Sequence, residues 1–299
     1  MYAKAVTLDP GLYIVATPLG NARDITLRAL DVLSAADIIL CEDTRTSSKL
    51  MQLYGITTKR MAYHEHNAAA MRPRILDWLT EGKALALISD AGTPLISDPG
   101  MPLVRAAREV GHYVTAVPGA SAPITALSIA GLPTDRFLFA GFLSSKQVAR
   151  RRSLAELAPL AASLVFFESA KRLPALLADI GEIFPNRTIC VARELTKKFE
   201  EVVSGTSEAL SAHFEAQAPR GEFVVMVAPG DKETASVDDI AAMLLDALET
   251  MSRRDAVQAV AEMSGHPRKE VYAQALALDK PDNNKKKSHD DSQAAEKDR

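Results

Sequence analysis

The sequence is poor in cysteine and aromatic residues and contains no long apolar run. Its two cysteines, Cys41 and Cys190, are too few for a disulfide framework or a cysteine metal site. Each lies in an apolar run, and we expect both to be buried as small hydrophobic side chains. No segment approaches the roughly 20 apolar residues of a membrane-spanning helix, and the first residues lack the apolar core of a signal peptide. These absences predict a cytoplasmic protein that does not associate with membranes.

Net charge and phosphate-binding motifs give no sign of a nucleotide enzyme. The 35 Lys and Arg residues against 38 Asp and Glu residues give a formal net charge of −3, so contact with a nucleic acid requires a local basic patch. Neither G-x-x-x-x-G-K-[ST] nor G-x-G-x-x-G after the first strand is present. One cluster is the best candidate for phosphate contact, although such a run is often only a solvated helix face: Lys146, Arg150, Arg151 and Arg152.

Apolar runs alternate with amphipathic segments in the first half of the chain. The runs are continuously apolar, which is typical of strands covered on both faces of a parallel sheet. After an N-terminal extension at 1–10, we therefore predict an α/β domain over 11–143 with right-handed crossovers. Its expected strands lie at 12–17, 36–43, 84–90, 113–118 and 137–142.

A polar, basic stretch after Gly141 marks a change of domain. The runs that follow predict a second α/β domain over 144–235, and three short amphipathic segments predict a helical domain over 236–278. The tail at 279–299 has almost no apolar residues, and we expect it to be disordered. The strands of the second domain are expected at 164–169, 188–195, 200–205 and 221–230, with helices at 173–184 and 207–217.

Three expected strands of the first domain end in loops of small residues, at 17–21, 89–94 and 117–122. Because the carboxyl ends of parallel strands meet at one edge of the sheet, these loops are expected to lie together. Glycine and alanine let a ligand approach the backbone closely, and Asp90 and Ser121 add a carboxylate and a hydroxyl. The loops could also be simple tight turns, but three at one edge favour a small-molecule pocket.

Eight motifs, taken together, resemble one family. In chain order they are TPLGN (17–21), CEDTR (41–45), SDAGTP (89–94), PGASA (118–122), LPTDRF (132–137), FFES (166–169), ARELTKKFEE (192–201) and GEFVV (221–225). The chain thereby resembles the ribosomal RNA small subunit methyltransferase I group of the tetrapyrrole-methylase superfamily, the class III methyltransferases, from about residue 11 to about 278.

The resemblance implies a fold, a reaction and a set of residues. It implies two α/β domains with the cofactor cleft between them, and a homodimer. The implied reaction transfers a methyl group from S-adenosylmethionine to the ribose 2′-hydroxyl of a cytidine in the decoding region of 16S rRNA, within the 30S subunit. The implied cofactor-binding residues are Pro18, Asp90, Ala91, Gly92, Ser121 and Ala122 in the first domain and Phe167, Glu168, Ala192 and Glu222 in the second.

Transfer to a hydroxyl requires a group that accepts its proton. In CEDTR, Glu42 or Asp43 could accept that proton and Arg45 could hold a phosphate, although Asp43 or Thr44 could equally cap the following helix. His64 is a further candidate base, because histidine titrates near neutral pH. His64 and Asn67 could instead contact the substrate, or they could have only a surface or packing role. A metal at the His64-x-His66 pair is not expected, because no third ligand is evident nearby.

Two other functions fit parts of the sequence. A related enzyme could methylate a tetrapyrrole such as a cobalamin precursor, but CEDTR, YHEHN and the helical segment resemble the ribosomal enzymes. A ribosome-assembly factor without chemistry would have no use for the small-residue loops. Basic residues of the helical segment could help it to dock on the ribosomal subunit: Arg253, Arg254, Arg268 and Lys269.

Overall fold

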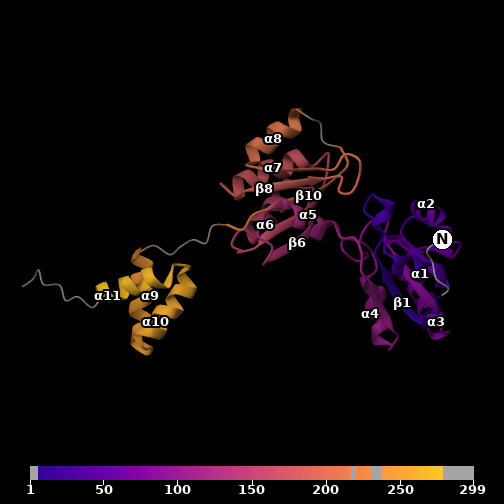
Figure 1. The fold of residues 1–299 in the computed structure, drawn as a ribbon, viewed down its shortest axis with the longest axis horizontal. Coiled ribbons are helices and arrows are strands. Elements are labelled where there is room, and N and C mark those ends of the chain that lie inside the picture. The colour runs from indigo at the N-terminus through magenta and orange to yellow at the C-terminus, as the bar shows by residue number, and fades with distance from the viewer. Residues whose placement is uncertain (1–5, 217–219, 231–236, 279–299) are drawn as a thin grey trace, which may run out of the picture. The chain divides into compact units, whose positions relative to one another are not determined.

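The computed structural model describes residues 6–216, 220–230 and 237–278. The chain forms two compact units, which divide after Pro229 (Figure 1). The first unit holds both β-sheets, and the second holds the last three helices. The tail at 279–299, predicted to be disordered, lies outside the described residues.

The first sheet is wholly parallel, with the strand order β3-β2-β4-β1-β5. Its central strand β4 is buried at every position, because helices cover both faces. The prediction of a buried parallel sheet is therefore confirmed. The strands are β1 (Gly11–Val15), β2 (Ile38–Cys41), β3 (Lys59–Ala62), β4 (Ala84–Ile88) and β5 (Val114–Val117).

Two pairs of helices cover the first sheet. Apolar side chains of α1 (Leu27–Ala35) and α2 (Thr44–Tyr54) pack on one face. Those of α3 (Glu65–Thr80) and α4 (Met101–Glu109) pack on the other. Thr26 directly precedes α1, and its side chain accepts a hydrogen bond from the backbone N–H of Ala29. The threonine is thus the N-cap of this helix.

The second sheet has the order β6-β7-β10-β8-β9, and only the β6–β7 pair is parallel. Strand β6 lies here, although the sequence assigned 137–142 to the first domain. That assignment is wrong because β6 pairs with β7, which sequence periodicity does not reveal. The strands are β6 (Phe137–Phe142), β7 (Ser163–Ser169), β8 (Ile189–Arg193), β9 (Glu201–Gly205) and β10 (Glu222–Val227).

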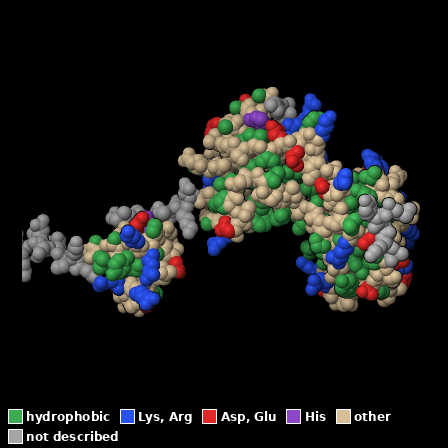
Figure 2. Space-filling model, viewed as in Figure 1, with side chains coloured by type: hydrophobic (Ala, Val, Ile, Leu, Met, Phe, Trp, Pro, Cys, Tyr) green, Lys and Arg blue, Asp and Glu red, His purple; other side chains and the backbone are tan. Residues whose placement is uncertain are grey.

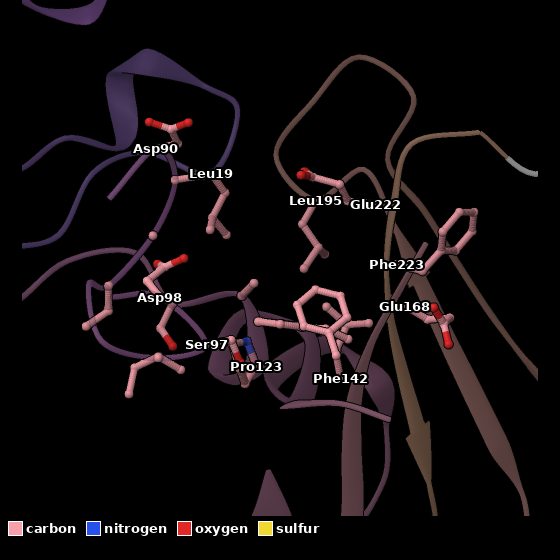
Figure 3. Close-up of a pocket in the computed structure, with 18 of the residues that line it drawn as sticks. Leu19, Asp90, Ser97, Asp98, Pro123, Phe142, Glu168, Leu195, Glu222 and Phe223 are labelled. Atoms are coloured by element: carbon pink, nitrogen blue, oxygen red, sulfur yellow. The ribbon is translucent and has the colours of Figure 1, made fainter. Parts of the chain in front are cut away.

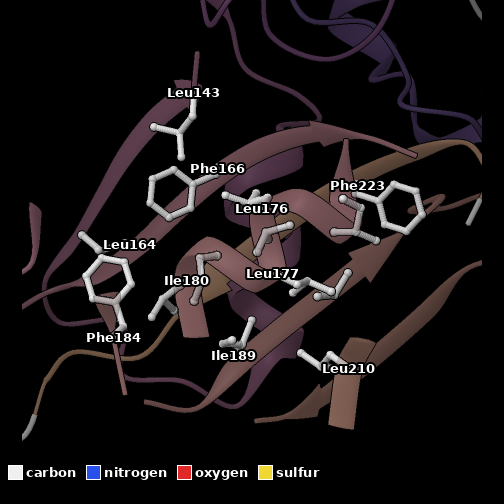
Figure 4. Packing of buried hydrophobic residues seen from close by; sticks show 14 of the residues in the cluster. Leu143, Leu164, Phe166, Leu176, Leu177, Ile180, Phe184, Ile189, Leu210 and Phe223 are labelled. Atoms are coloured by element: carbon white, nitrogen blue, oxygen red, sulfur yellow. The ribbon is translucent and has the colours of Figure 1, made fainter. Parts of the chain in front are cut away.

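The two faces of the second sheet have different covers. Helix α5 (Ala122–Ala130), which follows the last strand of the first sheet, packs on one face. The main core of the second sheet lies on the other face (Figure 4), formed with α7 (Leu173–Ile183) and α8 (Ser207–Ala216). Leu154 of α6 (Gln147–Leu157) joins this core. Cys190 is buried on the α5 side, and Cys41 is buried in the first sheet, as expected.

The second unit is a three-helix bundle around its own small core. It consists of α9 (Val237–Thr250), α10 (Arg253–Ser264) and α11 (Arg268–Leu278). Ser252 caps α10 by accepting a hydrogen bond from the backbone N–H of Asp255, and Gly265 ends the helix in the left-handed conformation. In the part of the chain that the structure describes, no helix is both long and apolar enough to cross a membrane.

Candidate functional site

Hydrogen bonds join the three small-residue loops at the carboxyl edge of the first sheet. Thr17, after β1, exchanges two backbone hydrogen bonds of 2.9 Å with Gly92, after β4. Thr93 donates its hydroxyl proton to the carbonyl of Ala120, after β5, at 2.9 Å. A Cβ atom on residue 92 would lie 3.1 Å from Leu19, and its φ of +79° favours glycine. The loops therefore form one ordered structure.

These loops and the second sheet enclose a cavity of about 400 Å³. Figure 3 shows Leu19, Asp90 and Asp98 on one side, Leu195 and Glu222 on the other, and Phe142 between them. The lining is mainly apolar with a few acidic groups, which is typical of a site for a small organic ligand.

On the side of the second sheet, Lys197 organises the wall of the cavity. Its ammonium group lies 2.9 Å from a carboxylate oxygen of Glu194 and 2.8 Å from one of Glu222. The hydroxyl of Thr196 accepts a hydrogen bond of 3.0 Å from the backbone N–H of Asn21, in the loop after β1. The loop after β8 thus contacts the loop after β1 directly.

Backbone strain is concentrated around the cavity. Among the described residues other than glycine, five have positive φ angles, and four of these lie in two loops of the site. Leu95 and Ser97 (φ 72° and 68°) follow β4, and Glu194 and Thr196 (φ 49° and 65°) follow β8. Such conformations cost about 1–3 kcal/mol each and cluster at functional sites. Their location supports a binding role for the cavity.

Most of the predicted cofactor-binding residues line this cavity. Pro18 and Ala192 do not: Pro18 is buried beside it, and Ala192 packs in the core between α5 and the second sheet. Those that do are Asp90, Ala91, Gly92, Ser121, Ala122, Phe167, Glu168 and Glu222.

Several lining residues did not emerge from the sequence. Lys197 lies inside the quoted motif ARELTKKFEE, but nothing in its sequence context predicted a place in the cavity. Asp98 belongs to the loop at 89–100, which is long for a connection without secondary structure, and such loops are often functional. Phe142 belongs to a strand that was assigned to the first domain. Further missed residues include Leu19, Ser97 and Leu195.

The predicted catalytic residues of CEDTR do not line the cavity. Asp43 is the N-cap of α2, where it accepts a hydrogen bond of 2.8 Å from the backbone N–H of Arg45 and forms an ion pair with that side chain. These hydrogen bonds lower the pKa of Asp43. The capping interpretation is confirmed for Asp43. Its backbone N–H also donates to Asp90, which ties this segment to the site.

His64 and Asn67 form hydrogen bonds at the N-terminus of α3. The backbone N–H of His64 donates to the Asn67 side chain at 2.9 Å, and that side chain donates to the carbonyl of Ala62. Neither residue lines the cavity. Within the described residues, no group of three or more histidine, cysteine, aspartate or glutamate side chains is arranged to hold a metal ion.

The predicted RNA-binding cluster divides into buried and exposed members. Arg150 is only 4% exposed, and its guanidinium group lies 2.6 Å from Asp179 of α7. Burial therefore removes Arg150 from the set, because a phosphate cannot reach it. Arg151 is half-buried and pairs with Glu182. Two members remain on the surface, Lys146 and Arg152.

Three carboxylates at this edge of the sheet have raised pKa values. Burial is the main cause for Glu42, Asp90 and Asp98, and the negative charges of their neighbours add to it. The effect is largest at Asp98, whose pKa is raised to about 6 by burial and by the charges of Glu42 and Asp90. The site therefore disfavours additional negative charge and favours a cationic ligand.

The family model of the tetrapyrrole (corrin/porphyrin) methylases matches residues 11–211, which include every strand of the first sheet and the first cavity loops. The chain belongs to the tetrapyrrole methylase family. A second family model, the RsmI C-terminal HTH domain, matches residues 234–279. The expected family and the two-sheet α/β fold with a helical appendage are thus confirmed.

Relatives of this methylase align along most of its length. A ribosomal RNA small subunit methyltransferase I from Erythrobacter litoralis is 51% identical over 92% of this chain and 98% of its own. One of the same name from Mesorhizobium japonicum is 46% identical over 91% and 93%. Among solved structures, a uroporphyrin-III C-methyltransferase from Thermus thermophilus complexed with S-adenyl homocysteine has a TM-score of 0.52 at 17% identity, covering 72% of this chain and 96% of that one. That structure supports the fold.

Proposed function

We propose that this methylase transfers a methyl group from S-adenosylmethionine to the ribose 2′-hydroxyl of a cytidine in 16S rRNA of the small ribosomal subunit. The observation that carries the proposal is the cavity, in which three joined loops of the first sheet face the strands of the second. The names of the relatives support the ribosomal substrate. The position of the methyl group and the identity of the nucleotide follow from the family resemblance.

The cavity fits the proposed cofactor chemically. Its backbone at Ala91 and Gly92 carries little or no side chain, so a ligand can approach the chain closely there. Glu168 is 2% exposed, and one of its carboxylate oxygens has no hydrogen-bond partner among the described residues. Acidic side chains suit a sulfonium cation. S-adenosylmethionine would supply an electrophilic methyl group, and the residues of the chain would align it with the acceptor.

An aromatic side chain is available for the acceptor base. Phe142 lines the cavity but is 58% exposed, and its ring lies 5.4 Å from that of Phe167. Gly141, with φ of +64°, lies at the irregularity of β6 that precedes it. An exposed ring beside a cavity can stack an unpaired base, which is how proteins commonly hold single-stranded RNA. We assign Phe142 to this role.

The helical unit would also bind ribosomal RNA. Its family model is named for a helix-turn-helix domain, and basic side chains begin two of its helices. Arg253 and Arg254 are exposed at the start of α10, and Arg268 and Lys269 at the start of α11. Figure 2 shows lysine and arginine side chains on the visible face of this unit. These positions suit contacts with phosphate groups. Lys146 and Arg152 remain candidates on the first unit.

The proposal also covers the oligomeric state of the enzyme and the cellular compartment in which it acts. The family resemblance implies a homodimer, which sedimentation of the purified protein would detect. Because the substrate is ribosomal, we place the enzyme in the cytoplasm.

The decisive experiment incubates the protein with methyl-labelled S-adenosylmethionine and 30S subunits that lack the modification. We expect label on the 2′-oxygen of one cytidine of 16S rRNA, located by nuclease digestion. Asp90→Ala should weaken cofactor binding in calorimetry, whereas Glu42→Ala, whose residue lies outside the cavity, should retain it. Cofactor binding without label on subunits or on naked RNA would contradict the ribosomal substrate. A tetrapyrrole precursor is then the acceptor to test.

A further inference from the structure

The loop at 95–98 is held in a strained conformation next to the cavity. Leu95 and Ser97 both have left-handed backbone angles. A Cβ atom on Gly100 would lie 2.9 Å from Leu87 and 3.2 Å from Leu95, and one on Gly141 would lie 3.1 Å from the Ser97 hydroxyl. The loop is therefore packed between the first sheet and the irregularity of β6. This packing determines where Asp98 lies.

Asp98 lines the cavity on the same side as Asp90 (Figure 3). The Ser89 hydroxyl, which donates to the backbone carbonyls of Ala91 and Gly92, lowers the pKa of Asp98. The charged groups that raise this pKa are Glu42 after β2 and Asp90 after β4. Both are acidic, so no positive charge among these neighbours stabilises the ionised form of Asp98. Across the cavity, the ammonium group of Lys197 is already paired with two carboxylates.

The other carboxylates that line the cavity are engaged. Asp90 accepts a hydrogen bond from the backbone N–H of Asp43. Glu168 accepts one from the backbone N–H of Ser169 and lies 3.1 Å from the Arg172 guanidinium group. Glu222 is paired with Lys197, as described above. Among the described residues that line the cavity, Asp98 is the carboxylate with neither an ion pair nor a backbone hydrogen bond.

We propose that Asp98 is the catalytic base, the group that accepts the proton of the acceptor hydroxyl. The inference rests on the proposed function. A bond forms between the ribose oxygen and the methyl carbon while the carbon–sulfur bond breaks, and its electron pair remains on the sulfur. The hydroxyl proton passes to a carboxylate oxygen of Asp98 and then to water. Phe142, which lines the same cavity, would hold the base of the nucleotide whose hydroxyl reacts.

The acid–base properties of Asp98 suit this role. With a pKa raised to about 6, the group is mostly ionised at neutral pH. It is also a stronger base than an ordinary aspartate, and a general base is most effective when its pKa lies near the operating pH. Glu42 and Asp90 raise this pKa through their negative charges, so they would act as positioning and tuning residues rather than as the base.

The test compares the wild type with Asp98→Asn and Asp98→Glu in single-turnover methylation of unmodified 30S subunits between pH 5 and pH 9. We expect Asp98→Asn to slow methyl transfer by about 10²–10⁴-fold and to abolish the rise in rate around pH 6, while Asp98→Glu restores part of both. Calorimetry should give a cofactor Kd within about twofold of the wild type for each variant. Asp77→Asn, on the exposed side of α3, is the matched control and should leave the rate unchanged.

Each remaining outcome contradicts the inference. An Asp98→Asn rate within tenfold of the wild type, or an unchanged pH profile, would show that another group takes the proton. A loss of cofactor affinity that accounts for the whole loss of rate would make Asp98 a binding residue instead. If the wild type binds cofactor but transfers no label to subunits, the proposed function fails and the inference fails with it. If the wild type and Asp98→Asn both methylate the subunits at similar rates, the inference about Asp98 fails and the proposed function stands.

Discussion

Gly20 packs so closely against Lys197 that a Cβ atom on residue 20 would overlap Cγ of the lysine side chain. The contact joins the loop after β1 to the loop after β8, beside the hydrogen bond from Asn21 to Thr196. Two carboxylates hold the lysine ammonium group, so the side chain cannot move away without losing an ion pair. The absence of a side chain at residue 20 thus determines how the two walls of the cavity meet.

We expect Gly20→Val to displace Lys197 from Glu194 and Glu222 and to weaken cofactor binding about tenfold, or about 1.4 kcal/mol. Lys197→Ala should have a similar effect. The measurement is calorimetric titration with S-adenosylmethionine. Lys198→Ala is the matched control, because Lys198 is exposed and does not line the cavity. Unchanged affinity in Gly20→Val would show that the wall tolerates the added side chain.

Replacement of Arg150 should destabilise the fold rather than reduce RNA contact. Arg150→Ala removes the nearest cationic partner of buried Asp179, which retains only the weaker contacts with Gln147 and Arg151, and such a loss costs up to about 3–5 kcal/mol. Arg152, two residues on, is exposed and pairs with Glu156 on the same helix, so Arg152→Ala should cost less than about 1 kcal/mol. Urea denaturation of both variants measures the difference. Equal stabilities would contradict a structural role for Arg150.

The raised pKa of Asp98 predicts a pH-dependent stability. An unfolded aspartate has a pKa of about 3.9, whereas that of folded Asp98 is about 6. The folded state thus holds the proton more tightly. The contribution to stability is present below about pH 4 and is lost as the pH rises through about 6.

Asp98→Asn removes this titration. Because Asp98 is partly exposed, solvent screening reduces the effect, and we expect the variant to be more stable than the wild type by about 1–2 kcal/mol at pH 7.5. At pH 4 the two proteins should differ much less. Denaturation curves at both pH values provide the measurement, with Asp77→Asn as the control. If the difference in unfolding free energy between the wild type and Asp98→Asn is the same at both pH values, the raised pKa of Asp98 is contradicted.

Phe142 should contribute to RNA binding more than to cofactor binding. Loss of a stacked base costs about 1–3 kcal/mol, so Phe142→Ala should raise KM for 30S subunits at least about fivefold. Phe137, at the other end of β6, is also exposed but lies outside the cavity, so Phe137→Ala is the control. Steady-state kinetics with saturating cofactor would test this. A normal KM for subunits together with weaker cofactor binding would place the ring against the cofactor.

Much of the site was predictable because its signals are local. Continuous apolar runs indicate the buried strands, and loops of small residues indicate where a ligand can approach, so Asp90, Gly92 and Ser121 are predictable from the sequence. Asp98 follows β4, as Asp90 does, but it lies a few residues beyond the motif SDAGTP. Only the packing of its loop against the irregularity of β6 places it in the cavity. The motif CEDTR is the opposite case. It lies at the carboxyl edge of the first sheet, where the cavity loops are, yet its Asp43 caps α2 and does not line the cavity.

The sequence by itself determined the alternation of strands and helices, the small-residue loops and the family resemblance, because each depends on residues close together in the chain. Tertiary structure decided which sheet β6 joins, which basic side chains are buried and which carboxylates meet at the cavity. Arg150 illustrates the difference: it begins a run of three arginines, yet its environment is set by Asp179, 29 residues away. Pairing between strands and burial of charge depend on contacts between distant segments, and periodicity along the chain carries no record of them.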